Sequence, residues 1–318
     1  MFDCHFDLLM YVYMCRNNIE KVKKYCDGIF KGDNITGGIF NFCYVDIDKL
    51  ETVLGMPEKD IDVVENFRVM NELVKEYKII PEDVVYILGI EGLDYLADIE
   101  DIDKLYELGL RSTNIVWNNP NKFGGGTKAS ADIGLTELGK RLVEKLVRTN
   151  VAIDLSHTNE KTFYGIIEEC KQLKLQGLNP ILHASHSNSR AICGVPRNLT
   201  DEQIKVIAND FNGTIGIVEY TPFVKDVGVD VPGNPSYEQY YLKHINHVKE
   251  LLGGIDNISV STDDMTFEYD ESEKPPVYKH EEVAKMIRKL LESNGYAKEE
   301  IEKILHKNFE TKILCKVI

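Results

Sequence analysis

Five side chains of the types that bind metal ions lie at the downstream ends of short apolar runs that resemble β-strands. They are His5, Asp7, Glu91, His157 and His186. A parallel barrel delivers the ends of all its strands to one face, so residues from distant parts of the chain can converge on one site. The pattern therefore favours a hydrolase that uses two metal ions.

The first of these runs carries two of the five side chains, in the tripeptide His5-Phe6-Asp7. Because alternate side chains of a strand share a face, we expect His5 and Asp7 to point together while Cys4 and Phe6 pack the other way. A single H-x-D is not specific, since short polar tripeptides of this kind are common. Its place on the first apparent strand favours a pair of metal ligands.

The other three side chains repeat this placement. Glu91 ends the apolar run 84–90, and His157 and His186 follow similar runs. An unpaired carboxylate would be very costly to bury at such a position, so Glu91 must be paired, hydrogen-bonded or bound to metal. Taken singly, each residue could be a surface glutamate or a core or loop histidine. Their common placement at strand ends favours one shared site.

The elements that must position these residues follow an alternating pattern. Apolar, β-branched runs alternate with charged segments of helical character, as in βα units. Eight strands with seven intervening helices and a closing C-terminal helical region predict a (β/α)8 barrel, as a single domain over residues 1–318. The predicted strands cover residues 2–8, 37–46, 84–91, 111–117, 151–156, 180–185, 213–220 and 257–263.

The clearest predicted helix covers residues 135–149. Leu138, Leu142 and Leu146 recur there at helical spacing, and Thr136 is a plausible first residue. Two stretches rich in Asn, Gly and Pro, 118–132 and 221–238, are predicted to be long loops that cover the site. There is no G-x-G-x-x-G after a strand and no Walker sequence, which removes the usual support for nucleotide binding.

Composition narrows the possible partners. The formal net charge of −15 on 318 residues would repel nucleic acid and acidic membrane surfaces. The first residues carry acidic side chains where a secretory signal would carry positive charge, so we expect a soluble, cytoplasmic protein. Seven cysteines without a C-x-x-C pair are expected to be reduced thiols, most of them buried.

Several segments, in order along most of the chain, resemble the membrane (renal) dipeptidases. These are zinc-dependent peptidases of the amidohydrolase type, built on a (β/α)8 barrel. The matching segments are Asp3-Cys4-His5-Phe6-Asp7-Leu8, Ile90-Glu91-Gly92, Leu105-Tyr106-Glu107-Leu108-Gly109-Leu110-Arg111, Gly134-Leu135-Thr136-Glu137-Leu138-Gly139, Ile153-Asp154-Leu155-Ser156-His157, Ser185-His186-Ser187, Arg197-Asn198-Leu199-Thr200-Asp201 and His244-Ile245-Asn246-His247-Val248, with Asn294-Gly295-Tyr296 and Lys307-Asn308-Phe309 near the end.

The resemblance implies two divalent metal ions. His5 and Asp7 would bind one, His157 and His186 the other, and Glu91 would bridge the two. Two such cations acidify a shared water and polarise the scissile carbonyl. Imidazole and carboxylate ligands suit zinc, although manganese or cobalt would also fit.

The resemblance also implies two roles beyond the metals. Asp263 matches the family aspartate that carries a proton from water to the leaving amine. Arg197 corresponds to the arginine that binds the free carboxylate of the substrate, a use that suits a planar guanidinium. Without the family context, Asp263 would be interpreted as a turn residue and Arg197 as an ordinary surface residue.

The chain departs from the family pattern in two places. Trp117 stands where the family has a histidine that helps to hold the tetrahedral intermediate, so Trp117 is expected at the substrate without that function. Stabilisation of the oxyanion would then depend on the metals or on Asn118, and the substrate could differ. The last strand continues Thr262-Asp263-Asp264-Met265-Thr266 in place of the family's S-D-F-D-G.

Three functions remain open from the sequence. The favoured one is a metallodipeptidase that cleaves short peptides with a free carboxylate. The second is a non-catalytic descendant that binds a small ligand or partner, for which Trp117 would be a sign of lost chemistry. The third is a related amide or lactone hydrolase with the same metal centre. Dimers are known in the family, which leaves a homodimer open.

Overall fold

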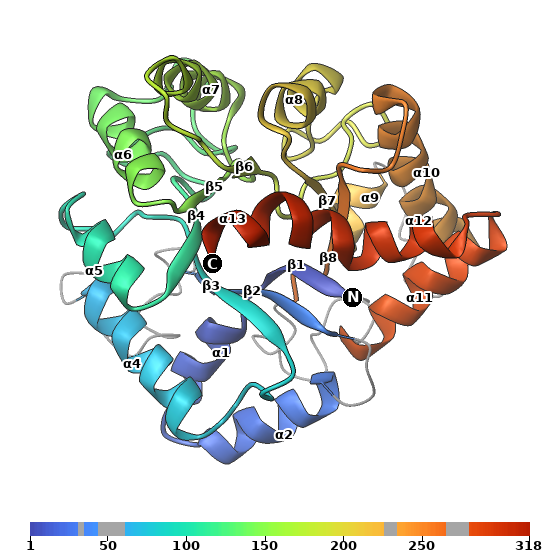
Figure 1. Cartoon of the computed structure of the whole chain (residues 1–318), viewed down its shortest axis with the longest axis horizontal. Helices are drawn as coiled ribbons and strands as arrows, with labels where there is room; N and C mark the ends of the chain where they lie inside the picture. The colour runs from blue at the N-terminus through green and yellow to red at the C-terminus, as the bar shows by residue number, and fades with distance from the viewer. Residues whose placement is uncertain (31–34, 44–60, 226–233, 265–279) are drawn as a thin grey trace.

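The structure is a computed structural model that describes residues 1–30, 35–43, 61–225, 234–264 and 280–318. Six parallel strands pair in chain order and form one curled sheet (Figure 1). A second sheet of two parallel strands follows. The strands are β1 (Phe2–Phe6), β2 (Gly37–Cys43), β3 (Val85–Glu91), β4 (Leu110–Asn114), β5 (Ala152–Asp154) and β6 (Leu182–His183) in the first sheet, and β7 (Ile215–Val218) and β8 (Ile258–Ser261) in the second.

Isolated parallel bridges lie at both junctions between the sheets. Ala184 bridges to Ile215 beyond β6, and Phe6 bridges to Asp264 between β1 and the residues after β8. The backbone N–H of Asp263 also donates to the carbonyl of His5, at 3.0 Å. The molecule is thus an α/β fold whose parallel strands curl around a common axis.

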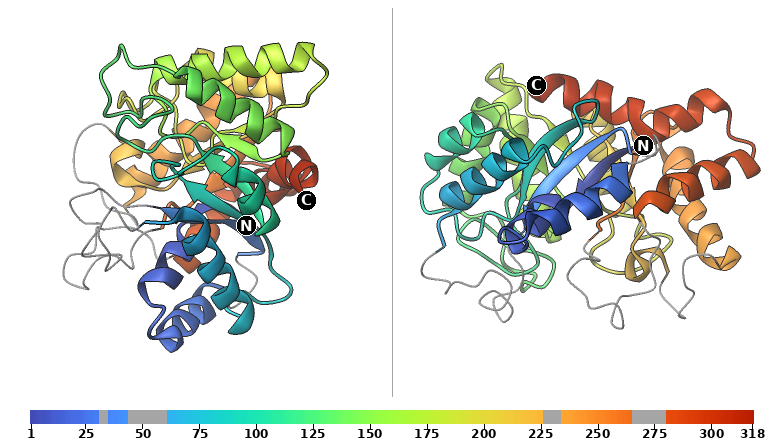
Figure 2. Two further views of the ribbon diagram at one scale, coloured as in Figure 1. Left: turned by 90° about the vertical axis from the view of Figure 1, so that its left-hand side faces the viewer. Right: turned by 90° about the horizontal axis from the view of Figure 1, so that it is seen from below.

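Helices surround the strands on the outside, as the views in Figures 1 and 2 show. No helix in the described part of the chain is both long and apolar enough to cross a membrane. The helices are α1 (Leu8–Met14), α2 (Ile19–Phe30), α4 (Val63–Glu76), α5 (Asp101–Glu107), α6 (Glu137–Arg148), α7 (Glu160–Leu175), α8 (Asp201–Lys205), α9 (Thr221–Val224), α10 (Pro235–Leu252), α11 (His280–Ser293), α12 (Lys298–Glu302) and α13 (Cys315–Val317), with π-helical segments at Val206–Asp210, Lys303–Lys307 and Glu310–Leu314.

Each of the eight predicted runs overlaps one strand, and only β4 begins outside its run, at Leu110. The end of the run 37–46 lies outside the described residues. The predicted helix at 135–149 is α6. Its cap is Thr136, whose side chain accepts a hydrogen bond from the N–H of Gly139 at 3.0 Å. Leu142 and Leu146 are buried, as the helical spacing requires. The alternation of strand and helix was therefore predictable from apolar periodicity.

The prediction of a long loop at 221–238 is wrong at both ends. Helix α9 begins at Thr221 and α10 begins at Pro235, while residues 226–233 lie outside the described part. Both helices carry proline in their first turn, where its missing N–H costs nothing. Asn234 caps α10 by accepting from the N–H of Ser236 at 3.0 Å. Pro222, Asn234 and Pro235, which suggested a loop, are here helix-start residues.

The alternation expected in β1 also fails at one point. Cys4 packs with Phe2 inside the curled sheet, whereas Phe6 packs in the outer core under the helices. A register shift between Asp3 and Phe6 interrupts the pairing of β1 with β2. Because an irregularity of this kind moves side chains to the other face, Cys4 and Phe6 do not pack together as the simple period predicts.

The inside of the sheet is closed at the N-terminal ends of the strands by the end of the chain. The rings of Phe2 and Phe309 stack with centroids 4.8 Å apart, and the side-chain amide of Asn308 donates to the carbonyls of Ile255 and Ile258. In Figure 1 this C-terminal helical stretch crosses the opening. Its apolar cluster comprises Phe2, Cys4, Ile39, Ile87, Ala152, Ile181, Phe309, Ile313, Leu314 and Val317.

None of the seven cysteines forms a disulfide, and five of them are buried. This agrees with the expectation of reduced thiols drawn from their number and spacing.

A close approach between β7 and the chain after β6 depends on Gly216. Its N–H donates to the carbonyl of Ala184 at 2.7 Å, and a Cβ at this position would overlap the carbonyl of Ser185. We therefore expect Gly216→Ala to lower the free energy of unfolding, measured in urea, by about 2 kcal/mol or more.

The matched control is Gly28→Ala in α2, where an added Cβ meets no atom within 4 Å. This change should raise stability by roughly 0.5 to 1 kcal/mol, because alanine is the better helix former. A neutral result for Gly216→Ala would mean that β7 can move away from Ser185 without cost.

Candidate active site

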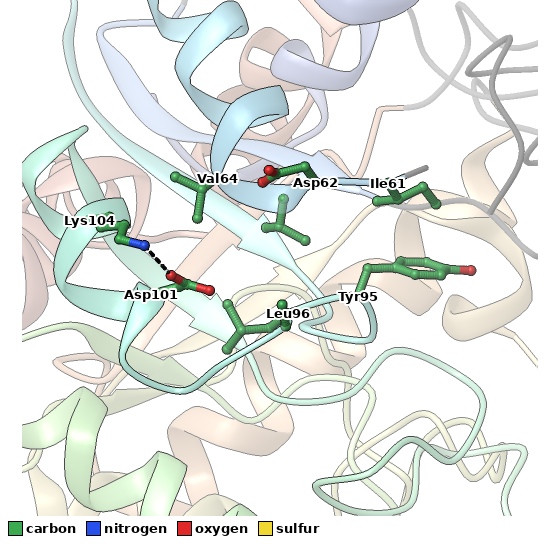
Figure 3. Close-up of a pocket in the computed structure, with 9 residues that line it drawn as sticks. Ile61, Asp62, Val64, Tyr95, Leu96, Asp101 and Lys104 are labelled. Carbon is green, nitrogen blue, oxygen red and sulfur yellow. Dashed lines mark hydrogen bonds and ion pairs between the residues drawn. The ribbon is translucent and has the colours of Figure 1, made fainter. Parts of the chain in front are cut away.

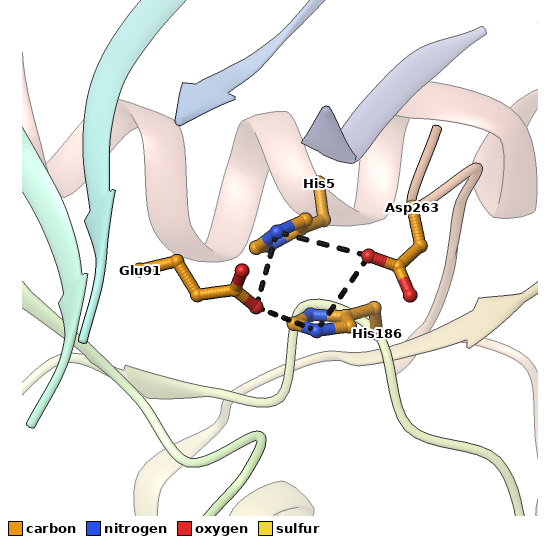
Figure 4. A group of neighbouring side chains, drawn as sticks. All are labelled: His5, Glu91, His186 and Asp263. Atoms are coloured by element: carbon orange, nitrogen blue, oxygen red, sulfur yellow. Dashed lines mark ion pairs between the residues drawn. The ribbon is translucent and has the colours of Figure 1, made fainter. Parts of the chain in front are cut away.

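The structure brings all five predicted side chains together at the C-terminal ends of the strands, with Asp263 beside them. Glu91 is the last residue of β3, and His5 lies in β1. Asp7 directly precedes α1, and His157, His186 and Asp263 follow β5, β6 and β8. Figure 4 shows His5, Glu91, His186 and Asp263 facing one another across the centre of the fold.

One oxygen of Glu91 is the centre of the group. Its Oε1 lies 3.3 Å from Nε2 of His5, 2.8 Å from Nε2 of His157 and 3.0 Å from Nε2 of His186. The Nε2 atoms of His157 and His186 are themselves 2.9 Å apart. Three imidazoles from three strands therefore present the same ring nitrogen to one carboxylate.

The two aspartates lie at the edge of this centre. Asp7 Oδ1 is 3.6 Å from Nε2 of His5. Asp263 Oδ1 is 4.0 Å from Nε2 of His5 and 3.9 Å from Nε2 of His186. Asp263 thus faces two imidazoles at nearly equal distances and makes no close ion pair with either.

Two residues of the group have left-handed backbone conformations. His157 has φ of 69° and Asp263 has φ of 53°. Such values are uncommon for residues other than glycine, although Asp and His are among those that adopt them most often. Strained conformations concentrate at functional sites because the surrounding fold holds them in place. Here they turn both side chains toward Glu91.

Several polar atoms of the group are buried without a hydrogen-bond partner among the described residues. They are Nε2 of His5, both carboxylate oxygens of Asp7, and Oε1 of Glu91. Unpaired buried polar atoms are expensive, so their concentration at one point needs an explanation. Imidazole nitrogens and carboxylate oxygens that converge in this way fit a divalent cation, and zinc in particular.

Burial and neighbouring charges set the protonation of the group. Burial raises the pKa of Asp7 to about 8 and that of Asp263 to about 6. Burial also lowers the pKa of His157 to about 4. For Glu91, burial alone would raise the pKa, but the nearby His5 and His157 hold it well below its ordinary value. A neutral His157 beside a charged Glu91 is the state that binds a metal ion.

Asn118 and Trp117 lie beside His157. The Oδ1 atom of Asn118 is 2.9 Å from Nδ1 of His157, which orients that ring. The half-buried Trp117 has its ring centroid 5.9 Å from that of His157. Asn118, the first residue of the predicted loop 118–132, therefore supports a histidine of the site.

Arg197 is buried close to the group and retains unused donors. Its Nη1 donates to Oγ of Ser187 at 2.7 Å, while its Nε and Nη2 are buried without a partner among the described residues. The guanidinium carbon lies 5.3 Å from the centroid of the Phe223 ring. An arginine held in this way presents two N–H groups to an anionic ligand.

Cys43 also lies at the site, and sequence reasoning missed it. It is the register partner of Glu91, and its sulfur lies within 4.8 Å of carboxylate oxygens of Asp7 and Glu91. Cys43 ends β2 just as Glu91 ends β3, so its place at a strand end could have predicted its position at the site. The predicted run extends past Cys43 to residue 46, which puts Cys43 inside the predicted strand and not at its end.

A cavity of about 290 Å³ lies away from this group, between the start of α4 and α5 (Figure 3). The ion pair of Lys104 with Asp101, at 2.8 Å, lies at its edge. None of the residues that line this cavity belongs to the group around Glu91. The lining residues are Ile61, Asp62, Val63, Val64, Tyr95, Leu96, Ala97, Asp101 and Lys104.

Imidazoles and carboxylates gathered at the C-terminal ends of parallel strands form the kind of site that metal-dependent hydrolases use. Residues 39–316 match the membrane dipeptidase family, peptidase family M19, and the chain belongs to that family. This confirms the resemblance to the membrane dipeptidases that was drawn from the sequence motifs. The match begins after His5 and Asp7, so their place in the site depends on the structure.

Individual relatives are distant. An uncharacterized protein of Acinetobacter calcoaceticus is 36% identical over 151 residues, which are 46% of this chain and 44% of that protein. The dipeptidase verJ of Clonostachys rogersoniana is 24% identical over 183 residues, 57% of this chain and 43% of that one. The matched regions therefore span less than half the length of these two relatives.

A solved structure shares the whole fold. It is a metallopeptidase from Rhodobacter sphaeroides, liganded with a phosphinate mimic of the dipeptide L-Ala-D-Ala. It aligns with a TM-score of 0.72 at 22% identity and covers 100% of this chain and 99% of its own. At this identity the similarity shows the fold alone.

The carboxylate oxygens of Asp7 have no hydrogen-bond partner among the described residues. We therefore expect Asp7→Asn to change the free energy of unfolding in opposite directions without and with zinc. In metal-free protein at about pH 8, Asp7→Asn should raise the free energy of unfolding by about 2 kcal/mol, because an amide avoids burying a charge. In zinc-loaded protein the same change should lower it, because a metal ligand is lost. Urea unfolding with chelator and with zinc measures both.

The control is Asp27→Asn, at an exposed position of α2, which should change stability by less than about 0.5 kcal/mol in both states. The same sign for Asp7→Asn with and without zinc would show that Asp7 does not face a metal ion.

Proposed function

We propose that the chain is a dipeptidase that uses two divalent metal ions to hydrolyse dipeptides with a free C-terminal carboxylate. The observation that carries the proposal is the convergence of three imidazole Nε2 atoms on Oε1 of Glu91. The proposal includes a single (β/α)8 domain over residues 1–318. The bridges from Ala184 to Ile215 and from Phe6 to Asp264 support closure of the strands into a barrel.

The proposed ligands divide into two sets around one shared residue. His5 and Asp7 would hold one ion, His157 and His186 the other, and Glu91 would contribute to both. The central place of Glu91 Oε1 supports this division, as do the unpaired oxygens of Asp7. When bound, a zinc pair supplies an activated water and polarises the scissile carbonyl. The protein contributes the positions of the ligands and a site largely closed to solvent.

Asp263 is the proposed proton carrier. Its carboxylate is 14% exposed, and burial raises its pKa to about 6, so it can hold or release a proton near neutral pH. It lies about equally far from His5 and His186, at 4.0 and 3.9 Å. A group so placed can take a proton from the attacking water and give it to the leaving amine.

Arg197 is the proposed site for the substrate carboxylate. Ser187 fixes one end of the guanidinium, and the buried Nε and Nη2 have no partner among the described residues. Two N–H groups in a plane match the two oxygens of a carboxylate. We propose Trp117, which lies beside His157, as an apolar wall for the substrate in place of the family histidine.

The Rhodobacter neighbour, whose ligand mimics L-Ala-D-Ala, makes L,D dipeptides a substrate class to test. We expect purified, metal-analysed protein to hydrolyse members of a panel of L,L and L,D dipeptides, to lose activity on chelation and to regain it with zinc. A protein that binds two zinc ions but hydrolyses no member of the panel would support a non-catalytic binding protein. Turnover confined to non-peptide amides or lactones would support the related hydrolase.

Asp263→Asn should leave the fold and the metal content intact, because Asp263 is the outermost carboxylate of the group. It should lower kcat by roughly a hundredfold to ten-thousandfold, the usual contribution of a positioned proton carrier. Steady-state kinetics together with metal analysis test this. Near-normal turnover with unchanged metal content would assign proton transfer to another residue.

Arg197→Lys should keep the positive charge but lose the planar pair of donors. We expect kcat/KM for free dipeptides to fall by roughly tenfold or more, while substrates with an amidated C-terminus change little. Measuring both substrates with both proteins separates the two effects. An equal loss on the two kinds of substrate would mean that Arg197 supports its loop and does not bind the carboxylate.

A further inference from the structure

A single serine hydroxyl lies between two of the histidines that converge on Glu91. Oγ of Ser185 is 2.6 Å from Nδ1 of His186 and 3.1 Å from Nδ1 of His5. The same hydroxyl makes a short hydrogen bond to Oδ2 of Asp154. All four residues are buried, so no solvent competes for these contacts.

The number of protons on this hydroxyl determines the direction of each hydrogen bond. A serine hydroxyl has one proton to donate and two lone pairs that accept. An ionised Asp154 can only accept, and its Oδ1 is already occupied by the backbone N–H groups of Ser156 and Ser185, at 3.0 and 2.9 Å. The serine proton therefore goes to Oδ2 of Asp154. Both imidazoles must then donate their Nδ1 protons to Ser185.

This direction matters because a neutral imidazole carries only one ring proton. With that proton on Nδ1, the lone pair of Nε2 is free, and Nε2 is the atom that His5 and His186 turn toward Glu91. Asn41 has its side-chain amide 3.1 Å from Nδ1 of His5. The nitrogen of this amide also lies 3.5 Å from the carbonyl of Ile39. Turning the amide over gives up only that long contact and lets the oxygen accept from the Nδ1 proton of His5.

We propose that Ser185 and Asp154 are positioning residues that hold His5 and His186 in the tautomer able to bind metal, and that this one hydroxyl links the two metal positions. The inference rests on the ligand roles assigned under the proposed function. His5 and His186 belong to different ions there, so one hydrogen-bonded group supports both. Outer hydrogen bonds of this kind commonly change metal affinity by about 10- to 100-fold.

The first test is Ser185→Ala, with zinc affinity of the metal-free protein measured by competition with a chromogenic chelator. We expect affinity for both zinc ions to weaken by about 10- to 100-fold. The matched control is Ser112→Ala. Ser112 is also buried and its hydroxyl lies 2.9 Å from Nε2 of His183, a histidine outside the group. Its zinc affinities should stay within about twofold of the unaltered protein.

Asp154→Asn gives a sharper test because the amide has only one accepting oxygen. The two backbone N–H groups require that oxygen at the Oδ1 position, so the NH2 group must face Ser185. The hydroxyl of Ser185 would then accept from this NH2 group and turn its own proton toward one imidazole. That imidazole would carry its proton on Nε2 and lose its ion. We therefore expect one zinc ion to be lost or greatly weakened and the other to be retained.

The tautomers can be measured directly on metal-free protein labelled with 15N at its eight histidines. The spectrum is recorded at a pH high enough for both rings to be neutral, because zinc bound at Nε2 would fix the tautomer by itself. Two-bond proton–nitrogen correlations should show Nδ1 protonated and Nε2 unprotonated for both His5 and His186. An unprotonated Nδ1 on either residue would overturn the proposal, and so would unchanged zinc affinity in a folded Ser185→Ala protein. This spectrum decides the question even if a variant fails to fold.

These outcomes are separate from those that test the proposed function. Absence of dipeptide hydrolysis with both ions bound and both tautomers as stated would reject the activity and leave the role of Ser185 standing. Normal dipeptide hydrolysis together with unaffected metal binding in Ser185→Ala and Asp154→Asn would support the activity and reject the role of Ser185.

Discussion

The structure depends on how several carboxylates and imidazoles can be removed from water together. A buried carboxylate is tolerated only where hydrogen bonds or opposite charge replace its lost hydration. Glu91 would meet this condition when cations are bound between its carboxylate and the three imidazoles that converge on it from the ends of β1, β5 and β6. The strands must therefore end at the same level and around the same axis, and the curled parallel sheet is the architecture that achieves this.

The two ends of the sheet serve different purposes: the N-terminal ends of the strands contribute stability, and the C-terminal ends carry the polar group of the site. At the N-terminal ends, apolar residues pack against the C-terminal helical stretch. At the C-terminal ends, polar atoms have no partner among the described residues, and His157 and Asp263 have strained backbones. Strain and unpaired groups reduce stability locally, so the apolar end has to compensate for what the polar end costs.

Apolar periodicity was enough to predict the eight strands and α6, and placement at strand ends was enough to predict that five side chains would meet. Asp263 was predicted only from the family resemblance, and Cys43 was not predicted. The failures have local physical causes. The irregularity in β1 that separates Cys4 from Phe6 depends on pairing with β2, which one strand does not encode. Proline is equally compatible with a loop and with the first turn of a helix, so the proline content did not reveal where α9 and α10 begin. Asp154 and Ser185 have ordinary roles in most proteins, and only their contacts with His5 and His186 distinguish them.

The stacking of Phe2 on Phe309 has a consequence for how the chain acquires its structure during synthesis. A ribosome releases Phe2 long before Phe309, so the interior of the sheet stays open at one end until Phe309 has emerged. Contacts between such distant parts of a chain form slowly, and apolar surface exposed in the meantime favours aggregation. A nascent chain of this protein therefore depends on protection of its strand starts, and termination before Phe309 would leave that surface permanently exposed.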